Sequence, residues 1–144
     1  MKYVLYGGRS GQAHPDLVAT LVDLGKVSRD LNANEDARHF FKLALKGLYD
    51  IHGREAINQQ IAIALTQLGG LSFCTGLLND SKKYFEQALD MKFKLYGDNV
   101  CNDDIGSTMN NLGSLHARMK NYHTAFSYYR LALDQYTRLS KEKG

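Results

Sequence analysis

The sequence repeats itself with a period of 44 residues. A Leu-Gly pair occurs three times at this spacing, as Leu24-Gly25, Leu68-Gly69 and Leu112-Gly113. A second series keeps the same spacing: an aromatic residue stands three positions before an Ala-Leu pair, at Phe41, Phe85 and Tyr129. A unit of this length is too small to bury its own apolar face and relies on neighbouring copies. The period therefore predicts a stack of helical hairpins.

Each repeat contains two amphipathic segments separated by a polar break. In the first repeat, leucines at helical spacing predict one buried stripe, formed by Leu17, Leu21, Leu24 and Leu31. Residues 32–34, Asn-Ala-Asn, favour a turn. A second helical pattern follows, with Ala37, Phe40, Phe41, Ala44, Leu45 and Leu48. The other two repeats show the same order, so the sequence predicts six helices and an all-α fold.

Capping residues mark the expected helix ends. Asn58 and Asn102 stand just before the first helix of repeats two and three, where a side-chain oxygen can accept from free backbone amides. His14 precedes Pro15 in the first repeat, and proline is tolerated in a first helical turn. Gly53 closes the first repeat, and glycine suits the left-handed residue after a helix.

The glycine of each Leu-Gly pair falls in the middle of a predicted helix. Glycine there costs about 1 kcal/mol relative to alanine. We therefore expect Gly25, Gly69 and Gly113 to allow a close approach between helices.

The period sets the repeat boundaries at residues 14–57, 58–101 and 102–144, within one continuous solenoid. The segment from Met1 to Gly7 is similar to the segment from Met91 to Gly97, where a second helix ends. Residues 1–13 are therefore interpreted as the end of a preceding repeat helix and a connector. We expect the chain to be a segment of a longer solenoid or a truncated copy.

Composition excludes several classes of protein. No apolar stretch approaches the roughly 20 residues that a membrane span needs. Two cysteines, Cys74 and Cys101, are too few for a disulfide framework, so we expect reduced thiols and a cytoplasmic protein. The net charge of +3 is too small to indicate nucleic-acid binding. The lysines that do gather, Lys82, Lys83, Lys92 and Lys94, are interpreted as a solvated helix face.

The sequence contains no recognisable catalytic constellation. The five histidines lack metal-ligand spacing, and the pair His116 and His123 has no third ligand nearby. His116 is instead expected to face the core or to act as a hinge residue. Residues 7–11 are glycine-rich but lack the lysine-threonine ending of a nucleotide loop. We expect no catalytic residue, no metal and no cofactor, and hence no enzyme.

The repeat resembles the tetratricopeptide pattern. After the Leu-Gly pair, an alanine follows twelve residues beyond the glycine, as Ala37 and Ala125; Ser81 replaces it in the second repeat. Within that superfamily the chain is similar to the long-repeat branch typified by kinesin light chains, in His14-Pro15-Asp16, in the residues 94–97 that close a repeat, and in the residues 109–112 inside one. The same repeat style also occurs in NTPase-coupled sensors and other adaptors. The resemblance implies a right-handed α-α superhelix of about three hairpins.

The resemblance also implies that function lies in a concave groove lined by the first helices, which binds a protein or peptide ligand. The groove positions carried over by this resemblance are Asp23, Lys26, Arg29, Thr66, Gln67, Phe73, Asn110, Asn111, Ser114 and Arg118. Amide side chains suit a groove because they both donate to and accept from a peptide backbone. The residue after each glycine is Lys26, Gly70 or Ser114, which departs from the asparagine of a carboxylate clamp.

An adaptor or scaffold that binds a peptide segment is therefore the expected function, without nucleic-acid or membrane partners. The alternative is a self-associating structural solenoid segment of a larger sensor or scaffold protein. In that case a homo-oligomer would form through the exposed solenoid ends, with Tyr128, Tyr129 and Tyr136 in the subunit contact.

Overall fold

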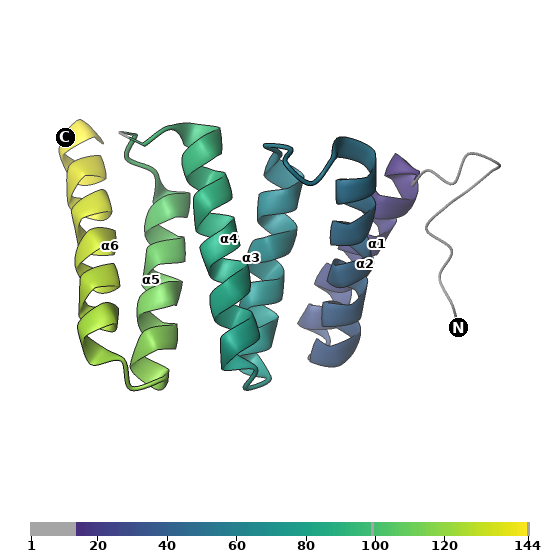
Figure 1. The fold of residues 1–144 in the computed structure, drawn as a ribbon, viewed down its shortest axis with the longest axis horizontal. Helices are drawn as coiled ribbons and strands as arrows, with labels where there is room; N and C mark the ends of the chain where they lie inside the picture. Colours follow the sequence, from purple (N-terminus) through teal and green to yellow (C-terminus); the bar gives the residue numbers. More distant parts are fainter. Residues whose placement is uncertain (1–13, 99, 144) are drawn as a thin grey trace.

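The described part of the chain forms a row of three helical hairpins (Figure 1). The structure, a computed structural model, describes residues 14–98 and 100–143. These residues contain α1 (Pro15–Asp30), α2 (Asn34–His52), α3 (Gln59–Cys74), α4 (Leu78–Tyr96), α5 (Asp103–Arg118) and α6 (Tyr122–Lys143). No strand occurs among them, so the expected all-α fold is confirmed. The interpretations of residues 1–13, including the glycine-rich segment, lie outside the described residues.

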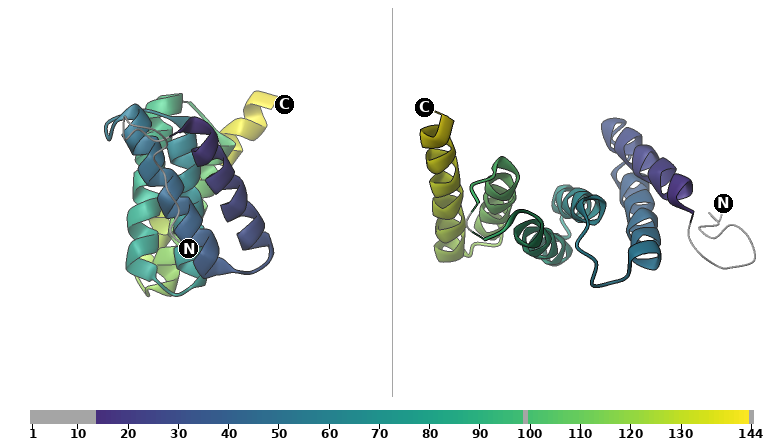
Figure 2. Two further views of the ribbon diagram at one scale, coloured as in Figure 1. Left: turned by 90° about the vertical axis from the view of Figure 1, so that its right-hand side faces the viewer. Right: turned by 90° about the horizontal axis from the view of Figure 1, so that it is seen from above.

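The hairpins stack in chain order and follow a curve. The two helices of each hairpin pack against each other, and neighbouring hairpins meet through α2 with α3 and through α4 with α5. Seen from above, α1, α3 and α5 lie on the inner side of the curve (Figure 2). The expected solenoid is therefore present, and its concave face is built from the first helix of each hairpin.

The expected caps are present at the helix ends. Asn58 Oδ1 accepts hydrogen bonds from the backbone N–H groups of Gln60 and Ile61, at 2.8 and 3.2 Å. Asn102 Oδ1 caps α5 in the same way. Gly53 has a φ of +93°, in the left-handed region, where its lack of a Cβ avoids strain. These polar and glycine residues thus mark the starts of α3 and α5 and the end of α2.

The Leu-Gly glycines make the close contact that the sequence predicts. A Cβ at Gly25 would lie 2.8 Å from the ring of Phe41, which comes from the second helix of the same hairpin. Gly69 and Phe85 repeat the arrangement, with 2.7 Å between the built Cβ and the ring. The series of glycines and the series of aromatic residues, both spaced by 44 residues, are therefore the two sides of one contact: an aromatic ring lies directly on a glycine backbone.

The core is a strip shared between hairpins, and its two ends are open. Leu68 and Leu112 are fully buried, whereas Leu24, one period earlier, is 38% exposed. Leu31 is 74% exposed. The prediction that Leu24 and Leu31 belong to a buried stripe is therefore wrong. The reason is positional, because within the described residues no second helix precedes α1 to cover this stripe.

One of the three tyrosines assigned to a subunit contact faces the interior instead. Tyr128 of α6 stacks on His116 of α5, with ring centroids 5.6 Å apart. His116 is 4% exposed, which confirms that it faces the core. Tyr128 is therefore half-buried within the third hairpin, whereas Tyr129 and Tyr136 are 39 and 37% exposed.

Candidate functional site on the concave face

An apolar pocket of about 430 Å³ opens between the first and second hairpins. Its walls include Val18, Ala19 and Val22 of α1, Leu48 and Ile51 at the end of α2, and Ile63 of α3. Asp23 and Lys26 of α1 add charged groups to this lining. Apolar walls with a few polar groups are typical of pockets that bind a ligand side chain.

A second, smaller pocket of about 170 Å³ occupies the equivalent place one period later, between the second and third hairpins. It lies among α3, the end of α4 and the start of α5. All eight of its lining residues stand 44 positions after a residue that lines the first pocket; among them are Lys92 for Leu48, Tyr96 for His52, and Asp104 for Gln60. The two pockets are thus built on the same backbone positions with different chemistry.

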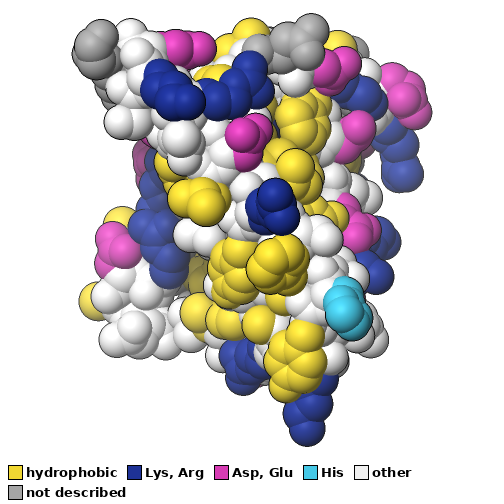
Figure 3. Space-filling model, turned by 90° about the vertical axis from the view of Figure 1, so that its left-hand side faces the viewer, with side chains coloured by type: hydrophobic (Ala, Val, Ile, Leu, Met, Phe, Trp, Pro, Cys, Tyr) yellow, Lys and Arg dark blue, Asp and Glu magenta, His cyan; other side chains and the backbone are white. Residues whose placement is uncertain are grey.

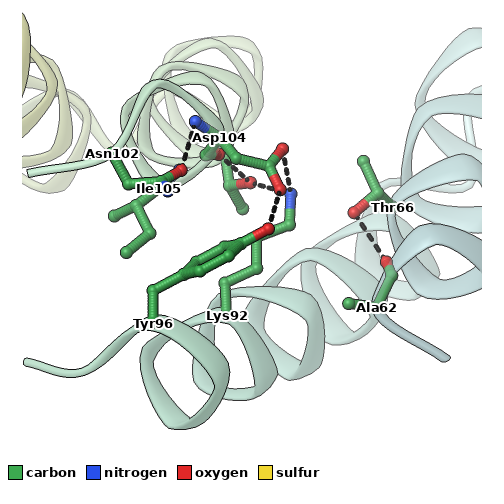
Figure 4. A network of polar contacts seen from close by, with 8 residues as sticks. Ala62, Thr66, Lys92, Tyr96, Asn102, Asp104 and Ile105 are labelled. Carbon is green, nitrogen blue, oxygen red and sulfur yellow. Dashed lines mark hydrogen bonds and ion pairs between the residues drawn. The ribbon is translucent and has the colours of Figure 1, made fainter. Parts of the chain in front are cut away.

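A buried lysine organises the second pocket (Figure 4). Lys92 is 3% exposed, and its Nζ donates to Asp104 Oδ1 at 3.1 Å and to Thr108 Oγ1 at 2.7 Å. The Thr108 hydroxyl donates in turn to the Asp104 carbonyl at 2.9 Å, which leaves its lone pairs for the ammonium. The prediction that Lys92 belongs to a solvated lysine face is therefore wrong, because α5 supplies a carboxylate and a hydroxyl opposite it.

Tyr96 completes this network from α4. Its phenol donates to Asp104 Oδ2 at 3.3 Å. Burial, the nearby Asp104 charge and this hydrogen bond together raise the pKa of Tyr96 above its ordinary value of 10.0. The phenol stays protonated as a donor, so Asp104 is held from two positions of α4.

The predicted groove residues fall into several separate groups. Asp23 and Lys26 line the first pocket, and Thr66 and Gln67 line the second. Arg29 Nη1 donates to Gln67 Oε1, so these two residues join α1 to α3. The Thr66 hydroxyl donates to the Ala62 carbonyl of its own helix at 2.8 Å.

The remaining predicted residues lie further along the concave face. Arg118 places its guanidinium 5.0 Å from the ring centroid of Phe73 and donates to the Phe73 carbonyl at 3.3 Å. Ser114 exchanges a hydrogen bond of 2.9 Å with the Tyr129 hydroxyl. Asn110 and Asn111 lie on α5 and line neither pocket.

The predicted groove positions lie on the first helices and cover only part of the pocket walls. They do not include the apolar residues Val18 and Ile63, or the residues that the second helices contribute, such as Leu48 and Lys92. A signal was present in the repeat alignment. Where the first junction has Leu48 and Ala64, the second has Lys92 and Thr108, so two positions change from apolar to polar together.

The third hairpin matches a known repeat family. Residues 105–142 match the family model described as tetratricopeptide repeat. No curated protein matches the sequence at a significant level. In the residues that the structure describes, no helix is long and apolar enough to cross a membrane, and no group of three or more metal-ligating side chains is found.

Solved structures share the fold. The structure is similar to that of BtubC (BKLC) from P. vanneervenii, with a TM-score of 0.78 and 17% sequence identity. The match covers 88% of this chain and 49% of that chain, so this chain spans about half the length of BtubC. At this identity the likeness concerns the fold.

These findings define a helical-hairpin solenoid of the kind that serves in protein interaction and scaffolding. The match over residues 105–142 and the shared fold support the resemblance to the tetratricopeptide repeat superfamily that the sequence indicates. That superfamily is generally non-catalytic.

Proposed function

We propose that the concave face binds an extended peptide segment of a partner protein and that the pocket between α1 and α3 takes a bulky apolar side chain of that segment. The observation that carries the proposal is the pocket itself, which is open, apolar and about 430 Å³ in volume. Ile63 is 39% exposed and contributes to its wall. Covering this surface would release water from apolar groups, which favours binding.

Polar groups beside the pocket supply orientation. Lys26 and Asp23 stand one turn apart on α1 and carry opposite charges. Arg29 extends this row by one more turn and is tied to Gln67 on α3. A peptide crossing from α1 to α3 would meet both signs of charge and one amide group. We propose that these groups fix the direction of the peptide, while the apolar pocket provides most of the affinity.

The remaining assignments belong to the same proposal. The chain acts as an adaptor or scaffold without catalysis, and its repeats are bounded at residues 14–57, 58–101 and 102–144. A cytoplasmic location is part of the proposal because Cys74 and Cys101 are both free thiols, as is usual in a reducing compartment. The fold shared with BtubC (BKLC) is in line with the long-repeat branch of the superfamily.

A displayed library of random peptides, about twelve residues long, tests the proposal. We expect selection against the chain to enrich peptides with at least one bulky apolar residue, with micromolar dissociation constants by fluorescence anisotropy. Ile63→Lys should weaken the selected peptides at least about tenfold, because it places an ammonium in the pocket wall. Ile57→Lys is the matched control, since Ile57 is 56% exposed and lines no pocket described here.

Two results would overturn the proposal. The first is a library that enriches no peptide over the background of an unrelated helical protein. The second is a set of selected peptides that bind Ile63→Lys as tightly as the parent chain while circular dichroism shows both folded.

A further inference from the structure

The outer side of α6 presents apolar side chains that nothing in the described chain covers. Tyr122, Phe126 and Leu133 are each about two-thirds exposed, at 65, 64 and 65%. Figure 3 shows hydrophobic side chains gathered over this end of the solenoid. One period earlier, Leu78 and Leu89 pack against the cluster that joins α4 to α5. The outer side of α6 therefore has the character of a hairpin-joining surface that no described hairpin covers.

The opposite end of the solenoid presents the complementary surface. Leu24 and Val27 of α1 are 38 and 56% exposed. Their equivalents in α3, Leu68 and Leu71, form a buried cluster with Phe41 of the preceding hairpin. The equivalents in α5, Leu112 and Leu115, do the same with Phe85. The two open ends thus carry the two halves of one interface, which occurs twice inside the molecule.

The start of α1 also carries the same aspartate and threonine pair that α5 contributes to the α4–α5 interface. The Thr20 hydroxyl donates to the Asp16 carbonyl at 2.9 Å, as the Thr108 hydroxyl donates to the Asp104 carbonyl at 2.9 Å. The Asp16 side chain is 95% exposed, and its Oδ2 lies 4.0 Å from Nδ1 of His14, so the carboxylate remains accessible to a further donor. α3 lacks this pair, because it has Gln60 and Ala64 at these positions.

On α6, the equivalent of Lys92 is Tyr136, which is 37% exposed. Its phenol is a hydrogen-bond donor, as the Lys92 ammonium is. If α6 met a second α1 in the register of α4 with α5, Tyr136 would stand opposite Asp16 and Thr20. In the same register Tyr129, which already lies on Gly113 as Phe85 lies on Gly69, would face Leu24 and Val27.

We propose that the chain self-associates head to tail, with α6 of one copy packed against α1 of the next as α4 packs against α5. The proposal goes beyond peptide binding, because it concerns the ends of the solenoid and leaves the concave face continuous from copy to copy. Such an interface is heterologous: each copy uses a different surface at each end. It therefore adds further copies, in an open row or a closed ring, and does not stop at a symmetric dimer.

Light scattering coupled to size-exclusion chromatography tests the proposal, from about 1 μM to about 1 mM chain. The parent chain should give a mass that rises with concentration in multiples of 16.2 kDa. Val27→Lys blocks the α1 side, and Leu133→Lys blocks the α6 side; each should raise the concentration for half-association at least about tenfold. An equal mixture of the two variants should recover a dimer, because each contributes one intact end.

Matched controls separate the interface from folding. Leu131→Lys makes the same change on α6 at a residue that is 48% exposed and lies about half a turn from Leu133, so it should leave association unchanged. Leu31→Lys is a second variant at the α1 end of the solenoid, at a residue that is 74% exposed and follows the last residue of the helix. Circular dichroism checks that every variant remains helical.

Two outcomes would overturn the proposal. A constant mass of 16.2 kDa over the whole range would mean that the open ends do not pair. A Val27→Lys chain that still dimerises alone would mean that α6 pairs with α6 in a symmetric contact. Ile63→Lys, the peptide-binding variant, should associate like the parent, so failure of one proposal is distinguishable from failure of the other.

Discussion

The two junctions between hairpins use the same backbone positions but hold them together in different ways. At the first junction, Leu48 is 1% exposed and packs in an apolar cluster with Ile61 and Ala64. At the second, Lys92 takes the place of Leu48 and bonds to Asp104 and Thr108. The first junction keeps an apolar pocket of about 430 Å³, and the second a more polar one of about 170 Å³.

This difference suits the two junctions to different roles, ligand binding at the first and structural support at the second. An apolar junction is held together by buried apolar area, which leaves its pocket free for a ligand. An ionic junction depends on geometry, because a buried ammonium is costly unless a carboxylate and a hydroxyl stand opposite it. The polar residues of the second pocket are therefore occupied with one another, which is why the first pocket is the better candidate for a peptide side chain.

The largest expected effect on stability comes from placing a lysine at the first junction, which lacks the partners that Lys92 has at the second. Leu48→Lys buries an ammonium opposite Gln60 and Ala64, which offer no carboxylate. We expect a loss of about 3 kcal/mol in the free energy of unfolding, measured by urea titration. Adding Gln60→Asp and Ala64→Thr should restore part of that loss. If the triple variant is no more stable than Leu48→Lys alone, the network depends on more than these three positions.

Removing the carboxylate at the second junction should have the next largest effect. Asp104→Ala leaves Lys92 buried with Thr108 as its remaining partner, and Tyr96 without its acceptor. We expect a loss of about 2 kcal/mol. Asp103→Ala is the control, because Asp103 is exposed in the same first turn of α5 and shares the same effect on the helix dipole. Equal losses for the two variants would contradict a specific ionic brace.

Replacing the whole network should cost little. Lys92→Leu, Asp104→Gln and Thr108→Ala together give the second junction the residues of the first. We expect a free energy of unfolding within about 1 kcal/mol of the parent, because well-packed apolar groups commonly substitute for a buried ion pair. A triple variant as unstable as Asp104→Ala would show that the two junctions differ in backbone geometry as well as in side chains.

The sequence predicts the local features of this fold well and the junction chemistry poorly. The caps at Asn58 and Asn102 and the contact of Gly25 with Phe41 follow from residues close in sequence or from the period. The burial of Lys92 depends on residues 12 and 16 positions later, on another helix. A charge pattern along α4 alone cannot reveal such partners, so the sequence predicts a solvated face for these lysines.

The candidate site was predicted in part for the same reason. The resemblance to tetratricopeptide repeats gave Asp23, Lys26 and Gln67, which do line pockets. It does not predict Val18 or Ile63 as pocket residues. The pattern assigns apolar residues on a first helix to the core, and only the structure shows the space between α1 and α3 that they line. The exposure of Leu24 was missed because periodicity describes an interior repeat, whereas Leu24 lies at an end.

The smallest expected effect concerns a second pair of equivalent positions that differ between the two junctions. Ser72 at the first junction is replaced by His116 at the second, and both are buried. Burial lowers the pKa of His116 below its ordinary value of 6.5; the charge of Lys82 lowers it further, and the charge of Glu86 opposes this. The folded state therefore favours the neutral imidazole more than the unfolded chain does.

A lowered histidine pKa determines the sign of the pH dependence. Well above pH 6.5 the imidazole is neutral in both states and contributes nothing to the pH dependence. As the pH falls below that value, the unfolded chain takes up the proton first, so the free energy of unfolding decreases until the folded state is protonated as well. Urea titrations at about pH 7.5 and pH 5 should show this loss, and His116→Gln should reduce it. His123→Gln, at an exposed position on α6, should not. An NMR titration midpoint for His116 at or above that of a free histidine peptide would contradict a lowered pKa. It would mean that the folded chain holds the charged imidazole beside Tyr128 without a penalty from burial.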